Sequence, residues 1–252
     1  MKGVLNREKL IDLNNIHIKA VLNILLKDCT TNNNILYANN RGSLEIKNEN
    51  LEADEIQPRI CKAKEKQKER TKKKAEVFSP AWICDKMASC IDSEQENKTW
   101  QEYVLSTVLE ITCGEAPFLA SRYDAATGDK INIENRIGLL DRKLRVVNNN
   151  TENYQDWFAW IVKAYQSTYG YEYQGDNLLI ARINLLLTFI DNLELKWNRE
   201  PEESELKEIA NIIVWNLWQM DGLTYKIPSS ETYARIKDWK ENEVLYFKDL
   251  FN

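Results

Sequence analysis

The chain has little histidine, glycine or proline. Its 252 residues include one His, 8 Gly and 5 Pro, whereas about 7% Gly and about 5% Pro are usual. The single histidine, His17, argues against a Ser-His-Asp hydrolase and against a zinc site built from histidines. Scarce Gly and Pro, together with 43% hydrophobic residues, exclude collagen-like and disordered classes and allow a sizeable core.

Several diagnostic patterns are also absent. The five cysteines form no C-x-x-C pair, and the sequence has neither the G-x-G-x-x-G dinucleotide fingerprint nor the G-x-x-x-x-G-K-[ST] phosphate loop. The net charge of −5 gives no overall attraction for nucleic acid. These absences disfavour binding of NAD or FAD and hydrolysis of nucleotides at a P-loop. They leave any contact with DNA to local patches.

No segment has the pattern of a membrane span or a secretory leader. The longest apolar run, residues 178–190, includes Arg182 and Asn184 and is shorter than the roughly 20 residues that a bilayer requires. The amino terminus lacks the basic, apolar and small-residue regions of a signal peptide. We therefore expect a core helix at 178–190 in a reduced, cytoplasmic protein that has no membrane partner.

From about residue 77 onward, short β-type runs alternate with amphipathic stretches, which is typical of an α/β fold with a mostly parallel sheet. We expect a mainly helical region with a basic arm over residues 1–75 and an α/β domain over residues 76–252. The aromatic residues between 154 and 165 fall on several helix faces, which favours core packing. The expected strands are 107–112, 167–173 and 214–220, and the expected helices are 7–27, 140–147, 153–166, 178–190 and 203–213.

A strongly basic run lies between Lys62 and Lys74. It has no apolar stripe, so it is either a solvated helix or linker, or an arm whose cations contact phosphates. In the second interpretation Lys72, Lys73 and Lys74 bind DNA.

The clearest signal for a ligand site is the segment from Glu110 to Leu119. An expected strand ends at an acidic residue, the chain turns at Gly114, and a helix through Tyr123 is expected to follow. In open α/β sheets this arrangement forms a nucleotide-sized crevice at the strand end. The only histidine is distant in sequence from Cys113, so a small buried residue is a better interpretation of this cysteine than a nucleophilic thiolate.

The pattern E-x-x-C-G-x-x-x-F-L, which runs from Glu110 to Leu119, resembles the D-P-A-C-G-S-G-A-F-L motif of S-adenosylmethionine-dependent DNA adenine-N6 methyltransferases. Three further elements follow that family's order over roughly residues 71–226. Ser79-Pro80 stands where the family has an upstream T-P, Gly170-Tyr171-Glu172 is similar to its G-x-E strand end, and Asp221-Gly222 is similar to its small polar turn. The same stretch resembles modification subunits of restriction systems.

The resemblance implies a Rossmann-like methyltransferase sheet with helices on both faces, and S-adenosylmethionine as cofactor. Glu172 would take the ribose hydroxyls, Asp221 the adenine amino group, and Phe118 with Ile111 the adenine ring. Backbone donors of the turn 113–115 would hold the methionine carboxylate, and Glu110 the methionine amino group. The candidate cofactor-binding residues are Ser79, Pro80, Glu110, Cys113, Gly114, Glu115, Phe118, Glu172 and Asp221. No metal is implied.

The sequence lacks the [DNS]-P-P-[YFW] loop with which this family holds the target adenine, because it contains no Pro-Pro pair. Three accounts remain open. The chain could bind the cofactor while a partner supplies the catalytic loop, it could be a catalytically inactive methyltransferase-like subunit that binds DNA or a protein, or Asp221 could polarise the target amino group. The leading hypothesis is a DNA adenine-N6 methyltransferase, or a subunit of one, in a restriction-modification system. Methylation of RNA or protein is a weaker third reading.

Overall fold

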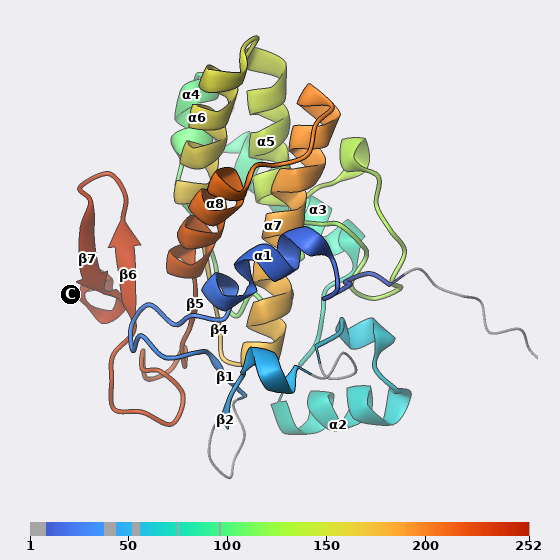
Figure 1. The fold of residues 1–252 in the computed structure, drawn as a ribbon, viewed down its shortest axis with the longest axis vertical. Coiled ribbons are helices and arrows are strands. Elements are labelled where there is room, and N and C mark those ends of the chain that lie inside the picture. The colour runs from blue at the N-terminus through green and yellow to red at the C-terminus, as the bar shows by residue number, and fades with distance from the viewer. Residues whose placement is uncertain (1–8, 38–43, 52–55, 75, 96, 252) are drawn as a thin grey trace, which may run out of the picture.

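The computed structural model describes residues 9–37, 44–51, 56–74, 76–95 and 97–251. Over these residues the chain is an α/β protein with eight α-helices and a three-stranded parallel sheet in the order β3-β4-β5 (Figure 1). The α/β class expected from the alternating pattern is confirmed.

All three expected strands are present, each shorter than predicted: β3 (Val108–Glu110), β4 (Thr168–Glu172) and β5 (Leu217–Gln219). Val108 is in register with Thr168, and Gly170 with Leu217. The expected third strand began too early, because residues 214–216 form the last turn of helix α8. Two helices precede each new strand: α5 (Leu139–Asn150) and α6 (Tyr154–Gln166) before β4, then α7 (Gly175–Trp197) and α8 (Glu203–Asn216) before β5.

Helix α7 runs through the centre of the molecule (Figure 1) and contains the apolar run 178–190, which is the buried core helix expected. Arg182 is fully buried in it and donates hydrogen bonds to the carbonyl oxygens of Leu217 (2.7 Å) and Leu25 (2.6 Å). These bonds join the start of β5, and the end of the first helix at Leu25, to α7. No helix among the described residues is long and apolar enough to cross a bilayer.

Helix α1 (Ile16–Leu25) packs against α7 and α8 as part of the same apolar core, so the core runs across the boundary placed at residue 75. The helix is shorter than the expected 7–27. Residues 9–14 form turns, and the side chain of Asn15 caps the helix by accepting the N–H groups of His17 (2.9 Å) and Ile18 (3.3 Å). Residues 7 and 8 lie outside the described part.

The second face of the sheet carries Tyr171 and Trp218, which pack on Ile236 and Phe247. These two residues come from strand β6 (Arg235–Asp238) and the short helix η4 (Phe247–Phe251); β6 pairs with β7 (Glu243–Tyr246). Over the described chain this apolar cluster contains no α-helical residue, so the expectation of helices on both faces is not met.

The helix expected after Gly114 is wrong. Residues 111–120 form consecutive turns, in which Thr112, Gly114 and Ala116 have φ angles of 50°, 56° and 61°. Left-handed residues at alternate positions cannot continue a right-handed helix. The next α-helix is α5, whose first N–H group, that of Leu139, donates to the carbonyl oxygen of Phe118 (2.7 Å).

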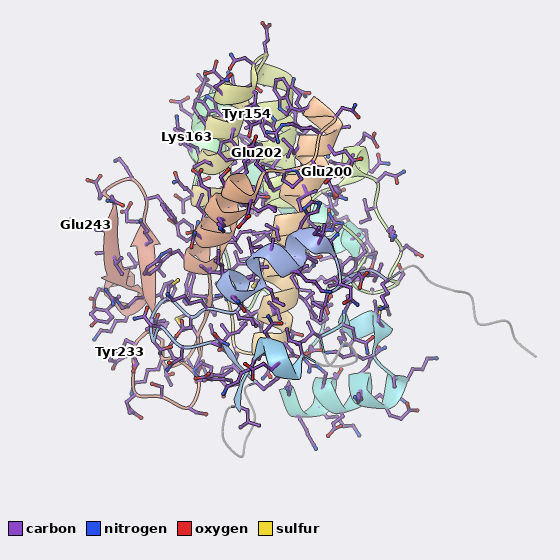
Figure 2. All side chains as sticks on the ribbon, viewed as in Figure 1. Tyr154, Lys163, Glu200, Glu202, Tyr233 and Glu243 are labelled. Atoms are coloured by element: carbon purple, nitrogen blue, oxygen red, sulfur yellow. The ribbon has the colours of Figure 1, made fainter. Side chains whose placement is uncertain are left out.

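The aromatic residues of α6 pack in the helical layer, as expected. Trp157 and Tyr165 are fully buried, and the hydroxyl of Tyr154, which Figure 2 labels, bonds to Glu205 of α8. The remaining elements are α2 (Lys64–Lys74), α3 (Ala81–Ser93), α4 (Trp100–Leu105), β1 (Leu36–Tyr37), β2 (Leu44–Glu45), η1 (Asn48–Asn50), η2 (Arg59–Cys61) and η3 (Ile133–Asn135).

Candidate cofactor pocket

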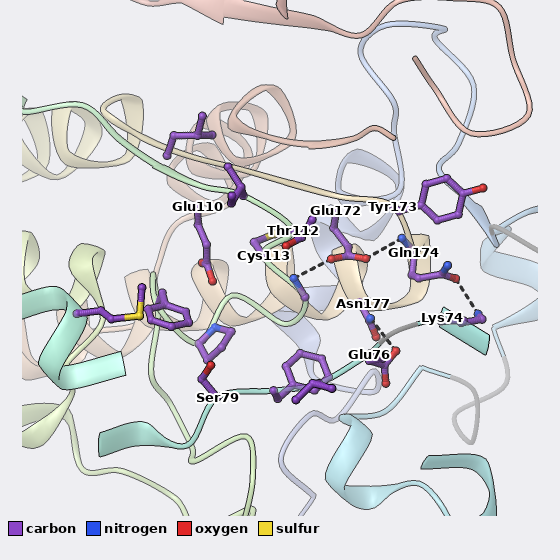
Figure 3. Close-up of a pocket in the computed structure, with 18 of the residues that line it drawn as sticks. Lys74, Glu76, Ser79, Glu110, Thr112, Cys113, Glu172, Tyr173, Gln174 and Asn177 are labelled. Carbon is purple, nitrogen blue, oxygen red and sulfur yellow. Dashed lines mark hydrogen bonds between the residues drawn. The ribbon is translucent and has the colours of Figure 1, made fainter. Parts of the chain in front are cut away.

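A cavity of about 1200 Å³ lies at the carboxyl ends of β3 and β4, where open α/β sheets bind ligands. Segment 76–79, the end of α2, one side of α3 and the start of α7 form further walls, so residues distant in the sequence meet there (Figure 3). Its volume suits a nucleoside-sized ligand. The apolar lining consists of Val77, Phe78, Met87, Ala88, Ile91, Leu109, Ile111, Pro117, Phe118 and Leu139.

Glu172, the last residue of β4, lies in this cavity and is 7% exposed. One carboxylate oxygen accepts the N–H of Gly114 at 2.8 Å and the other accepts the N–H of Gln174 at 2.9 Å (Figure 3). Burial raises the pKa of this carboxyl, against the effect of these two donors. The side chain therefore fixes the turn after β3 to the end of β4, and the N–H of Gly114 is already used.

Glu110, the last residue of β3, points into the same cavity (Figure 3). Burial raises the pKa of its carboxyl well above the usual range, the N–H of Phe118 opposes the rise, and the charge of Glu172 adds to it. Oε2 of Glu110 is buried and has no hydrogen-bonding partner among the described residues. Buried acceptors are normally satisfied, so this oxygen is available to a ligand.

Gly114 brings the two expected cofactor motifs into contact. Its φ is +56°, and a Cβ at this position would lie 2.4 Å from Cε1 of Phe78. Glycine adopts this φ without strain, and its missing side chain leaves room for the ring of Phe78. Ser79 lines the cavity, whereas Pro80 precedes α3 as its N-cap and is outside the lining.

Cys113 lines the cavity and is 2% exposed, which confirms the expected small buried residue. Burial raises the pKa of its thiol well above the usual range, and Glu110 and Glu172 add to the rise. A thiolate is therefore disfavoured, and Cys113 serves as packing beneath the turn.

Glu115 is not among the residues that line the cavity. Its carboxylate accepts the N–H of Arg59 (2.5 Å) and the hydroxyl of Tyr123 (2.6 Å), and burial raises its pKa to about 7. These contacts fasten the segment around Arg59 to the turn after β3. The side chain therefore has a structural role. The role that the resemblance implied for this residue, a backbone donor of the turn, stays a prediction.

Asp221 is likewise outside the cavity lining. Its carboxylate accepts the N–H of Leu223 at 2.8 Å, and its neighbour Gly222 lies against Tyr171, on the sheet face opposite Glu172. At the third strand end, Gln219 instead bonds to the backbone of Leu36 in β1 (2.7 and 2.8 Å). The structure therefore brings Glu110 and Glu172 together but leaves Asp221 apart from them.

The basic run forms α2, which has no buried residue and whose end borders the cavity. Lys74 donates to Oε1 of Gln174 at 2.7 Å (Figure 3), and Lys73 pairs with Glu69 at 2.6 Å. Lys72 lines the cavity with no hydrogen-bonding or ion-pair partner among the described residues. The run is thus helical from Lys64 onward, and binding of DNA by its lysines stays a prediction.

A buried ion-pair network beside the cavity is what the sequence reasoning missed. Arg70 pairs with Glu76 (2.6 Å) and with Asp176 (2.7 Å), and Lys62 pairs with Asp176 (3.0 Å). Burial opposes ionisation of Asp176, but the two cations overcome it and lower its pKa to about 2. Asn177 adds a hydrogen bond to Glu76 at 3.0 Å. The network holds α2 against the start of α7 and so positions the lysines at the rim.

No group of three or more His, Cys, Asp or Glu in the described ranges is arranged to hold a metal ion. Comparison of the chain with protein-family models, with curated proteins and with solved structures finds no match. The site is therefore interpreted from its own geometry and chemistry.

Proposed function

We propose that this chain is the S-adenosylmethionine-binding domain of a DNA adenine-N6 methyltransferase of the restriction-modification type. One observation supports this most: Glu110 and Glu172 end adjacent parallel strands and share an apolar cavity, and Oε2 of Glu110 is buried without a partner. The order of the sequence elements supplies the choice of family.

The charge of the cavity suits this cofactor. S-adenosylmethionine carries two positively charged groups, a sulfonium and an ammonium. Burial raises the pKa of Glu110 and Glu172, and a cation bound nearby favours the ionised form of both carboxyls. Glu110 is placed to accept the ammonium. The lone pairs of Glu172 that its two backbone donors leave free can accept ribose hydroxyls. Phe78 and Phe118 offer apolar surface for the adenine ring.

Two of the three backbone donors of the turn 113–115, which the resemblance implied for the methionine carboxylate, are already used. The N–H of Gly114 donates to Glu172, and that of Cys113 donates to the carbonyl oxygen of Tyr171 at 2.8 Å. We assign the carboxylate to Lys72, which lines the same cavity. When bound, the cofactor supplies an activated methyl group for an adenine nitrogen. The residues of this chain bind and orient it.

A second candidate function, a catalytically inactive subunit that binds a partner protein, is favoured by the outer edge of β3. The N–H of Val108 donates to Ser167 next to β4 (3.0 Å), so the backbone groups of Leu109 face away from β4. No described strand pairs with that edge, and the side chains of Leu109 and Ile111 are 41% and 64% exposed. Such an edge accepts a strand from another polypeptide.

Calorimetric titration with S-adenosylmethionine tests the proposal. We expect saturable binding, and we expect Glu172→Ala to weaken it about tenfold or more. The substitution removes the hydrogen bonds from the ribose hydroxyls to the carboxylate, and a hydrogen bond to a charged group is worth roughly 1.5–3 kcal/mol. Asp221→Ala is the matched control and should bind like the parent, since Asp221 lies outside the cavity. Absence of binding by folded protein overturns the proposal. A loss caused by Asp221→Ala and not by Glu172→Ala would return the adenine contact to Asp221.

Mass spectrometry of DNA digested after incubation with the protein and S-adenosylmethionine tests whether the chain is catalytically complete. N6-methyladenine formed by the chain alone supports a complete enzyme. Cofactor binding without this product supports a subunit whose target-holding loop comes from a partner.

A further inference from the structure

We propose that a second pocket, built around Arg122 and Arg136, binds the phosphate group of a ligand. The pocket has a volume of about 590 Å³ and is bounded by the loop 130–133 and by the second half of α7. Asp191 lies in this second pocket, and Asn177 lies in the first. Fourteen helical residues separate them, which is about 21 Å along the helix at 1.5 Å per residue. The two pockets are therefore distinct sites.

Two arginines in this pocket share one carboxylate oxygen. Nη2 of Arg136 lies 2.6 Å from Oδ2 of Asp191, and Nη1 of Arg122 bonds to the same oxygen. The side chains of Arg136 and Arg122 are only 8% and 17% exposed. One carboxylate cannot neutralise two adjacent guanidinium groups, so the cluster of these three side chains carries a positive charge.

The hydrogen-bonding capacity of the two arginines is also incomplete. Nε of Arg122 and Nη1 of Arg136 are buried and have no partner among the described residues. The remaining nitrogen contact of Arg136 is a bond from Nε to the carbonyl oxygen of Ile131 at 3.3 Å. Buried guanidinium donors are normally satisfied, so two orphaned N–H groups beside an open pocket point to an acceptor from outside the chain.

Both basic and acidic groups surround the cluster. Lys9 and Lys130 line the pocket together with the acid Glu194, and Lys9 lies 3.9 Å from Asp12. Asp141 also faces the arginines: its Oδ2 accepts the N–H groups of Ser121 (2.7 Å) and Gly138 (3.2 Å), its Oδ1 is buried without a partner among the described residues, and burial raises the pKa of this carboxyl, which disfavours its charged form. Burial lowers the pKa of Arg122, Asp191 and Asp141 oppose this effect, and Arg136 adds to it.

Phosphate is the ligand chemistry that fits these donors. Planar guanidinium groups bind tetrahedral oxyanions through parallel N–H bonds, and two of them side by side match a doubly charged group. The phosphate can come from a small molecule or from the backbone of DNA.

The test measures the unfolding midpoint of the protein in increasing inorganic phosphate, with ionic strength held constant by sodium chloride. We expect a saturable rise of about 2–4 °C at saturating phosphate. Arg136→Gln should abolish this rise. Arg142→Gln is the matched control, because Arg142 is similarly buried and paired with Asp85 and Asp92 but lies outside the pocket; it should keep the rise. A parent protein that shows no rise beyond that of chloride overturns the proposal.

A second variant keeps the test decisive if Arg136→Gln does not fold. Asp191→Asn retains both arginines and removes their shared carboxylate, so phosphate should raise its midpoint by more than it raises that of the parent. An equal or smaller rise contradicts the proposal. Binding of a short duplex to Arg136→Gln identifies the source: weaker binding indicates the DNA backbone, and unchanged binding indicates a small phosphate compound. None of these results depends on S-adenosylmethionine.

Discussion

Helix α7 borders two pockets whose unsatisfied charges have opposite sign. Near its start, Glu110 and Glu172 are buried carboxyls whose pKa is raised. Near its end, Arg122 is a buried guanidinium whose pKa is lowered, and it shares Asp191 with Arg136. In both places the described residues do not fully compensate the cost of burying the charged group. Each pocket is therefore suited to a ligand of the opposite charge: a cation in the first and an anion in the second.

The network of Lys62, Arg70, Glu76 and Asp176 lies between α2 and α7 and behaves differently. Its members are as deeply buried, yet the pKa of Asp176 falls to about 2 because the cations outweigh burial. Burial alone therefore does not mark a binding site. At Glu110 and Arg122 a buried polar atom is left without a partner among the described residues, whereas Asp176 is paired with two cations of the fold.

Breaking the paired network should have the largest effect on stability. We expect Arg70→Met to lower the free energy of unfolding by about 3–5 kcal/mol, because it leaves Glu76 and Asp176 buried without their shared cation. Lys73→Met is the control, since the Lys73–Glu69 pair is exposed and such pairs contribute little to stability. Urea unfolding measures both. Equal effects of the two substitutions would contradict the distinction between the network and the surface of α2.

The pH dependence of stability should distinguish buried carboxyls that have no ion-pair partner from those that have one. The pKa of Glu115 is raised from 4.5 to about 7, so the folded state holds a proton that the unfolded state releases in this range. The contribution of Glu115 to the free energy of unfolding is present below pH 4.5 and falls by about 3 kcal/mol as pH rises to 7. The pKa of Asp176 is shifted in the opposite direction, from 3.8 to about 2. Its contribution to the free energy of unfolding is therefore lost as pH falls through this range.

Glu115→Gln should therefore flatten the slope of unfolding free energy between pH 4.5 and 7. Glu203→Gln, which changes an exposed carboxylate of α8, serves as its control. A slope unchanged by Glu115→Gln would mean that its contacts with Arg59 and Tyr123 keep it ionised.

Much of the fold and the centre of the site could be predicted from the sequence. Glu110 and Glu172 each end a short β-type run, and parallel strands that end together place such residues side by side. The apolar run 178–190 is too short for a membrane and had to be core. These predictions depend on local patterns, which the sequence carries directly.

The parts that were wrong or missed depend on tertiary contacts. Left-handed φ angles at Thr112 and Ala116 are not marked by glycine, so the turn after β3 looked like a helix start. Asp221 lies away from the cavity because the C-terminal cluster around Phe247 holds the chain on the other face of the sheet. Arg70 looked solvated within a basic run, although its partner Asp176 lies 106 residues further along the chain.

Replacing the unpaired carboxyl of the first pocket should improve stability while it weakens binding. We expect Glu110→Gln to raise the free energy of unfolding by about 1 kcal/mol at pH 8, seen as a rise of about 2–4 °C in Tm, because a neutral amide costs less to bury. The same substitution should weaken binding of S-adenosylmethionine, since it removes the negative charge. A loss of stability would show that the carboxylate is satisfied within the fold.

The smallest expected effect concerns the rim, where Lys72 gives the acidic pocket a positive border. If DNA crosses α2 to reach the cavity, then in the absence of S-adenosylmethionine, to whose carboxylate the same lysine is assigned, Lys72→Gln should lower the slope of log affinity against log salt by about 0.9, the value for one phosphate contact. Lys240→Gln is the control, because Lys240 is 90% exposed and does not line the cavity; it should leave the slope unchanged. Fluorescence anisotropy of a labelled duplex at several salt concentrations measures both slopes.

Because the charge of the whole chain is −5, attraction for DNA must come from such local cations. Equal slopes for parent and Lys72→Gln would therefore move the DNA path away from α2 and reduce its lysines to a solvated helix end.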